Sequence, residues 1–199
     1  MKTKIFIFTL FFLASFVLEA KPDSSLILDK EAARDMLAET EDFSVSCPSD
    51  WKEELKAEIL TLKGPLLPDS KRPFIAIRQE KDEAAIRSME KTKEVYYRWK
   101  DLPAFKGQML KFIMPIFETI YGVDRYKFVS CDYGENGDFI TQRLVSLDKA
   151  RNMKVCDTSF ITKARPTRGY SLIFFCPEEH YDEYFPVFEK CLASFSVKE

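Results

Sequence analysis

Two strand–turn–strand patterns in the second half of the chain constrain its fold more than any other feature. In the first, the segments RYKFVSCDY and DFITQRLVSL (125–133 and 138–147) flank the turn GENG. In the second, MKVCDTSFITK and YSLIFFC (153–163 and 170–176) flank ARPTRG. Two strand-forming segments joined by a short turn that contains glycine indicate a β-hairpin. Two successive hairpins predict an α+β fold with an antiparallel sheet, for which we expect about five to seven strands.

The first half of the chain adds further strand patterns and two short helical patterns. FSVSCP (43–48) alternates apolar and polar residues, as half-buried strands do. EILTL (58–62) and FIAIRQ (74–79) also fit strands. DKEAARDMLAETED (29–42) begins with a capping aspartate and carries an apolar stripe, so it predicts a helix. SDWKEELKA (49–57) predicts a helical turn.

The middle of the chain and its C-terminus carry longer helical patterns. Residues 81–100 repeat apolar positions every three or four residues, and a second helix is expected from Pro103, with a kink at Pro115. The segment from Pro177 predicts a last helix that Pro186 bends or divides. We expect its apolar stripe to fill the interior; the stripe consists of Tyr181, Tyr184, Phe185, Phe188, Cys191, Leu192 and Phe195.

The N-terminus has the order of a secretory signal peptide. Two lysines precede an apolar run, Ile5–Leu18, and the small residue Ala20 follows. We expect residues 1–20 to be a signal peptide. An uncleaved anchor is the alternative, but the run is short of the roughly 20 residues that a spanning helix needs. The remaining residues, 21–199, suit one domain, in which the helical patterns at about 81–121 form one segment.

The five cysteines are odd in number, so at least one has no partner within the chain: Cys47, Cys131, Cys156, Cys176 and Cys191. None of the spacings is C-x-x-C, which argues against a zinc ribbon or a thioredoxin-type motif. A turn centred near Pro166 places Cys156 opposite Cys176, which predicts a disulfide between them in an exported chain. Two buried thiols are the alternative. Cys191 lies on the apolar stripe and is expected in the core.

The single histidine, His180, lies among four acidic residues: Glu178, Glu179, Asp182 and Glu183. A metal site or a histidine–carboxylate acid/base pair would use such residues, but helix-borne zinc motifs need a second histidine. Acidic side chains are also favoured in the first turn of a helix by its dipole. We therefore interpret this cluster as a helix start, and we predict no metal, cofactor or catalytic residues.

Other functional patterns are equally sparse. The sequence has no nucleophile-elbow, dinucleotide-binding or phosphate-loop motif. Its charges are mixed along the chain, with a net charge of −2, so no basic block indicates nucleic-acid binding. A carboxylate pair for hydrolysis stays open, since acidic residues are numerous. The aromatic stretch EVYYRWK (94–100) is either a binding surface or one buried edge of a helix.

Three segments together resemble a known family. They are FSVSCPSDW near the start of the mature chain, the strand YSLIFFC, and the final HYDEYFPVFEKCLASF. These segments are similar to those of the PsbP-like group, which includes the DcrB-like exported proteins. The resemblance implies an antiparallel sheet with helices on both faces, an α/β/α sandwich. The family is functionally mixed and implies no shared catalytic residues.

The sequence thus predicts an exported, non-catalytic accessory or binding protein, periplasmic or secreted. Its expected partner is another envelope or extracellular protein, and we expect no permanent membrane span after signal cleavage. Two other hypotheses stay open. One is a secreted hydrolase that uses a carboxylate pair, and the other is a secreted factor that binds a partner through the helices of residues 81–121.

Overall fold

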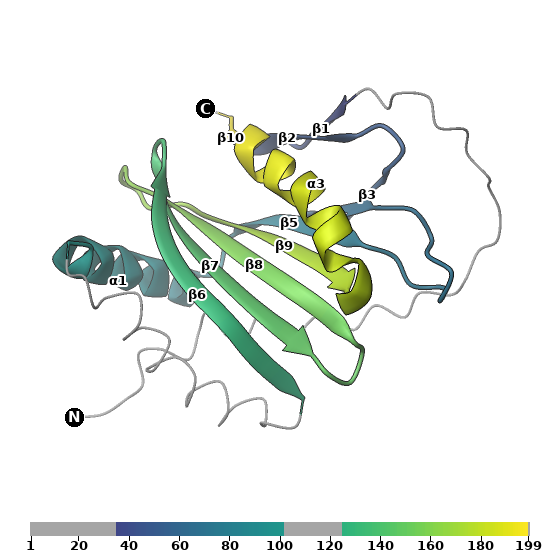
Figure 1. The fold of residues 1–199 in the computed structure, drawn as a ribbon. Coiled ribbons are helices and arrows are strands. Elements are labelled where there is room, and N and C mark those ends of the chain that lie inside the picture. The colour runs from purple at the N-terminus through teal and green to yellow at the C-terminus, as the bar shows by residue number, and fades with distance from the viewer. Residues whose placement is uncertain (1–34, 102–124, 199) are drawn as a thin grey trace.

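The computed structural model describes residues 35–101 and 125–198 (Figure 1). The elements in chain order are β1 (Asp35–Glu39), β2 (Phe43–Pro48), β3 (Lys52–Lys56), β4 (Ile59–Lys63), β5 (Phe74–Glu80), α1 (Glu83–Trp99), β6 (Tyr126–Asn136), β7 (Phe139–Asp148), β8 (Met153–Thr162), β9 (Gly169–Pro177), the 3-10 helix η2 (Glu178–His180), α3 (Tyr181–Ser194) and β10 (Ser196–Val197). The strands form two sheets. The larger has seven strands in the order β3-β4-β5-β9-β8-β7-β6, and the smaller has the order β1-β2-β10.

All strand pairs in both sheets are antiparallel, as the hairpin patterns predicted. The two predicted hairpins are β6–β7 and β8–β9, and they stand next to each other in the larger sheet. The larger sheet therefore has the predicted number of strands. The smaller sheet is a separate layer that the sequence did not predict.

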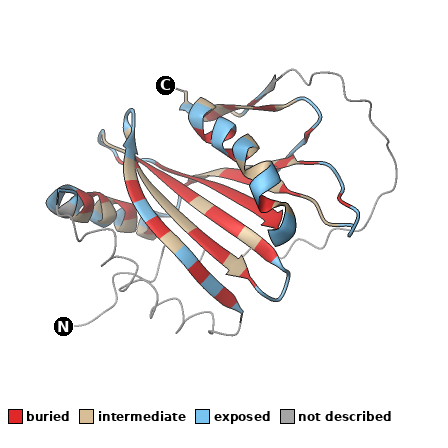
Figure 2. Ribbon diagram, in the orientation of Figure 1, coloured by how far each residue is buried: buried red, intermediate tan, exposed pale blue. Residues whose placement is uncertain are grey.

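One face of the larger sheet packs against α3, and we call it the α3 face (Figures 1 and 2). Every second residue of β9 points into this core, and the ring of Phe174 stacks on that of Phe188 in α3, 5.2 Å between centroids. The predicted interior position of the last helix is confirmed, because Phe188, Leu192 and Phe195 are 0%, 6% and 8% exposed. α3 runs through Pro186 as a single helix, so the division expected there does not occur.

The opposite face of the larger sheet meets α1, and we call it the α1 face. Asp82 caps this helix, since its side chain accepts hydrogen bonds from the backbone N–H groups of Ala84 and Ala85. Met89 lies directly over Gly169 of β9. Met89 and Tyr96 belong to a second apolar cluster that also contains Ile140 and Ile161. Residues of α1 therefore pack in a different apolar cluster of the larger sheet from those of α3.

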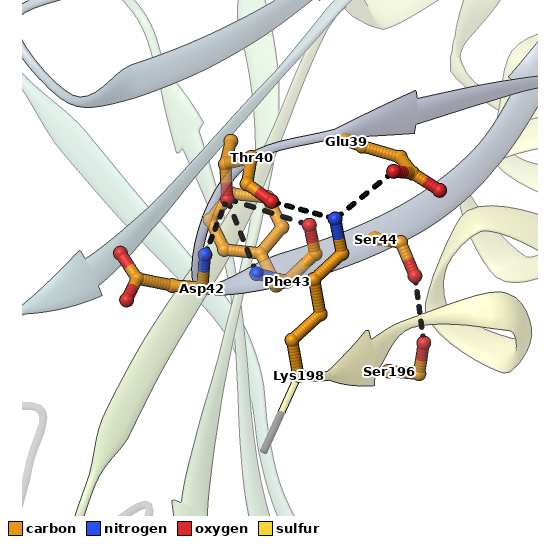
Figure 3. A network of polar contacts seen from close by, with 7 residues as sticks. All are labelled: Glu39, Thr40, Asp42, Phe43, Ser44, Ser196 and Lys198. Carbon is orange, nitrogen blue, oxygen red and sulfur yellow. Dashed lines mark hydrogen bonds and ion pairs between the residues drawn. The ribbon is translucent and has the colours of Figure 1, made fainter.

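The C-terminus closes the smaller sheet (Figure 3). β10 pairs with β2, and the Lys198 ammonium donates hydrogen bonds to Glu39 Oε2 at 2.9 Å and to the Thr40 carbonyl at 2.8 Å. The backbone N–H of Lys198 donates to the Asp42 carbonyl at 2.9 Å. These contacts join the last described residues to the turn between β1 and β2.

Two helix predictions in the first half of the chain are wrong. Within the predicted helix 29–42, residues 35–39 form strand β1, which pairs with β2. Within the predicted helical turn 49–57, residues 52–56 form strand β3, which pairs with β4. Hydrogen bonds to a neighbouring strand override the local helical preference in both segments. The predicted signal peptide and the helix expected from Pro103 lie outside the described residues.

Candidate functional site

A row of polar side chains crosses the α1 face of the larger sheet. Arg78 of β5 lies opposite Ser171 of β9, Ser171 opposite Ser159 of β8, Ser159 opposite Gln142 of β7, and Gln142 opposite Tyr133 of β6. Directly opposed residues of neighbouring strands point to the same side of a sheet. Tyr133 belongs to the apolar cluster that includes α1, which places the row on the α1 face. We call these five residues the polar row.

Three residues of the polar row are buried, and Arg78 and Gln142 are half-buried. Ser159 and Ser171 are each 5% exposed. Gln142 Nε2 donates a hydrogen bond of 2.6 Å to the hydroxyl of Tyr133. Apolar residues lie on both sides of the row, with Ile161 toward α1 and Ile173 on the other side. Buried hydrogen-bonding groups between two apolar clusters cost free energy unless they are satisfied, so the position of the polar row is a candidate for function.

The carboxyl groups of Glu80 and Asp157 lie next to the polar row, and both interact electrostatically with the guanidinium of Arg78. Arg78 Nη2 lies 4.0 Å from Glu80 Oε2, and the Glu80 side chain is 6% exposed. Burial raises the pKa of Glu80, and it raises the pKa of Asp157 to about 6, against the attraction of Arg78. Glu80 Oε2 and Asp157 Oδ1 are buried, and neither accepts a hydrogen bond within the described part of the chain. Glu80 and Asp157 are thus two buried carboxyl groups with raised pKa values beside one guanidinium, the kind of perturbation that functional sites often show.

Polar contacts anchor α1 beside the row. The buried ammonium of Lys93 donates to the Thr162 carbonyl at 3.0 Å and to Thr167 Oγ1 at 2.9 Å, at the turn between β8 and β9. Burial lowers the pKa of Lys93. Near the C-terminal end of α1, the Lys163 ammonium pairs with Glu135 Oε2 at 2.6 Å. Hydrogen bonds from Lys163 and Lys100 lower the pKa of Glu135 to about 2.

The histidine cluster lies where η2 ends and α3 begins. His180 ends η2 and directly precedes α3, and its Nδ1 lies 3.2 Å from Glu183 Oε2. Asp182 and Glu183 lie in the first turn of α3, where the helix dipole favours acids. Across residues 35–101 and 125–198, no group of three or more histidine, cysteine, aspartate or glutamate side chains is arranged to hold a metal ion.

The pairing expected for the second hairpin is wrong by two residues along β9. Cys156 lies opposite Phe174, and Cys176 lies opposite Lys154, so the two cysteines are diagonal neighbours on the α3 face. Diagonal Cα atoms of an antiparallel pair are about 7–8 Å apart, beyond the usual span of a disulfide. Both are free, buried thiols, and burial raises their pKa values to about 11 and about 12.

The sequence allowed two interpretations of the aromatic stretch 94–100, a binding surface or a buried edge of a helix, and its two tyrosines differ in this respect. Tyr96 is 8% exposed and stacks on Tyr133, with 6.4 Å between ring centroids. Tyr97 is 45% exposed, and the Lys100 ammonium lies 5.5 Å from the centre of its ring. Of these two tyrosines, Tyr96 therefore belongs to a buried edge of the helix and Tyr97 is directed to the surface.

Sequence reasoning missed the polar row altogether. Ser159 and Ser171 lie inside segments that were correctly predicted as strands, but a serine in a strand carries no signal by itself. The available signal was the alternation of each hairpin, which places polar residues of successive strands at matching positions. Recognising the polar row from the sequence would have required the strand order β5-β9-β8. No local sequence pattern indicates a pairing between residues so far apart in the chain.

Comparison with known proteins identifies the fold. No family model matches the sequence, and no curated protein matches it. Among solved structures, LpqN of Mycobacterium tuberculosis, described as involved in cell envelope biogenesis, is similar at 9% identity with a TM-score of 0.50, over 85% of this chain and 93% of LpqN. The cyanobacterial PsbP protein (CyanoP) of Synechocystis sp. PCC 6803 is similar at 10% identity with a TM-score of 0.47, over 87% of this chain and 98% of CyanoP. At these identities the likeness concerns the fold alone, and the protein has an antiparallel α+β fold similar to that of LpqN.

Proposed function

We propose that this chain is an exported, non-catalytic accessory or binding protein of the cell envelope or the secreted space. Two features support the proposal. The first residues have the order of a signal peptide, and the fold is similar to that of LpqN, whose description places it in cell envelope biogenesis. Neither described helix has the length and apolar content that a membrane span requires.

The observation that carries the non-catalytic part of the proposal is the state of the reactive side chains. The one imidazole of the chain is paired with Glu183 at a helix start. The thiols of Cys131, Cys156 and Cys176 are buried, and burial raises their pKa values to about 11 or about 12, so they are protonated at neutral pH. A protonated, buried thiol is a poor nucleophile. These groups therefore serve packing and helix initiation.

A pull-down tests the binding role. The protein is used as bait against native envelope extract and against native medium, and a stoichiometric partner is expected. Tyr97→Ser is the test variant in α1, and Leu55→Ser in β3 is its matched control. Both side chains are exposed, at 45% and 59%. If the partner binds the helical segment, Tyr97→Ser reduces its recovery and Leu55→Ser does not. Absence of any partner, together with turnover in a hydrolase screen, would refute the proposal.

One observation favours hydrolysis as the second candidate. Burial raises the pKa values of Glu80 and Asp157, and a carboxyl with a raised pKa can act as a general acid near neutral pH. A hydrolase of this kind would lose activity in both Glu80→Gln and Asp157→Asn while remaining folded. Turnover that persists in both variants would exclude this pair as the acid and base.

A further inference from the structure

Four of the five cysteines lie in one apolar cluster on the α3 side of the larger sheet. They are Cys47 of β2, Cys156 of β8, Cys176 of β9 and Cys191 of α3. Cys131 belongs to the other cluster, on the α1 face. The fold thus separates the odd cysteine from an even set, and the pairing question concerns these four residues.

Cys47 and Cys191 face the same interior from two elements that pack together. β2 alternates buried and partly exposed residues, and Cys47 is on its buried side at 1% exposure. Cys191 lies on the buried stripe of α3 at 0% exposure. α3 packs against β2 (Figure 1). The thiols of Cys47 and Cys191 therefore both point into the apolar core that β2 and α3 share.

A series of contacts aligns β2 with the end of α3 in opposite directions. The rings of Phe43 and Phe195 lie 5.7 Å apart. The hydroxyls of Ser44 and Ser196 are 2.8 Å apart and form one of the hydrogen bonds drawn in Figure 3. Continuing along β2 means moving back along the chain from β10 into α3, because β10 and β2 are antiparallel.

The next contacts in this series reach the two cysteines. The backbone N–H of Ser46 donates to Ser194 Oγ at 2.9 Å, and Ser194 Oγ donates to the carbonyl of Cys191 at 3.0 Å. One serine hydroxyl therefore joins the residue before Cys47 to the backbone of Cys191. The next inward residue of β2 is Cys47, and the buried residue of α3 one turn before Ser194 is Cys191.

We propose that Cys47 and Cys191 form a disulfide that ties the smaller sheet to the last helix. The bond forms when the two thiols lose two protons and two electrons to an oxidant of the disulfide class, which is itself reduced to two thiols. The biological setting rests on the export that we propose above, since disulfides persist outside the reducing cytosol. Because both sulfurs are buried in the folded chain, the bond forms during folding, before the core closes.

Mass mapping of the refolded chain tests the pairing. The full chain is refolded in a buffer of reduced and oxidised glutathione, remaining thiols are alkylated in denaturant, and the digest is analysed by mass spectrometry. We expect the peptides of Cys47 and Cys191 to be joined, at a mass two hydrogens below their sum, and Cys131 to be alkylated. Recovery of all five cysteines as alkylated thiols, or of Cys156 joined to Cys176 in place of this pair, would overturn the proposal.

Two variants and one further sample separate the causes of a failure. Cys47→Ser is expected to leave Cys191 fully alkylatable, whereas Cys131→Ser, the matched control on the other face, should leave the linked peptide unchanged. The same mapping is then applied to the chain exported by its own N-terminus. A link after refolding that is absent in the exported protein contradicts export into an oxidising compartment, whereas a missing link after refolding contradicts the geometry itself.

Discussion

Replacing Gly169 with alanine tests the contact that places α1 on the sheet. A Cβ at this position would lie 2.0 Å from Met89 Sδ and 2.8 Å from Met89 Cε. Carbon and sulfur atoms in contact need more than 3 Å, so Met89 must move by more than an ångström. Met89 has a flexible side chain, but it is 6% exposed within a packed cluster. We expect Gly169→Ala to lower the free energy of unfolding by about 1–3 kcal/mol, the usual cost of overpacking.

Urea unfolding followed by circular dichroism measures this change, and a double-mutant cycle assigns it. Met89→Ala removes the clashing atoms and by itself costs about 2–5 kcal/mol as a large-to-small core substitution. In that background Gly169→Ala should cost roughly 0.5 kcal/mol or less, which gives a coupling of about 1–3 kcal/mol between the two positions.

Gly134→Ala is the matched control for this experiment. Gly134 is also a strand glycine, but the nearest atom to its added Cβ, Thr141 Oγ1, is 3.3 Å away, so we expect a much smaller loss of stability. Equal costs of Gly169→Ala in the presence and absence of Met89 would show that α1 does not press on β9, and the reasoning would be refuted.

Three further predictions concern the row, the helix anchor and a turn. The pKa of Asp157 is about 6 in the folded chain against an ordinary 3.8, so the folded protein retains a proton that the unfolded one has released. Stability should therefore fall as pH rises through this window, and Asp157→Asn should remove about 3 kcal/mol of that fall in unfolding experiments across pH 3–8. Lys93→Met leaves the Thr162 carbonyl and its neighbours without their buried donor, and thermal unfolding should show a loss of about 1–3 kcal/mol. Ala57 and Glu58 have φ values of 49° and 65° in the two-residue turn between β3 and β4, where asparagine and glycine are the favoured residues. The double variant Ala57→Asn with Glu58→Gly should therefore raise the free energy of unfolding by about 1–2 kcal/mol, measured by urea unfolding. A destabilised double variant would contradict this turn geometry.

Much of the fold was predictable because its strongest signals are local. The two hairpins β6–β7 and β8–β9 each join neighbouring segments through a short turn, so their pattern is complete within a few dozen residues. α1 and α3 show apolar stripes over 17 and 14 residues, long enough for the helical period to be unambiguous. The interpretation of His180 and its acids as a helix start has the same local basis.

The sequence by itself determined the hairpins, the two long helices and the aromatic interior of the tail, because alternation, helical period and turn residues act between neighbours in the chain. Tertiary structure decided the rest. β1 and β3 are strands because β2 and β4 supply their hydrogen bonds, in competition with a local helical pattern. Arg78 joins the polar row only where β5 meets β9, and Cys47 meets the last helix only through the smaller sheet. Such contacts join residues far apart in the chain, and their energy depends on strand order and register, which no short segment encodes.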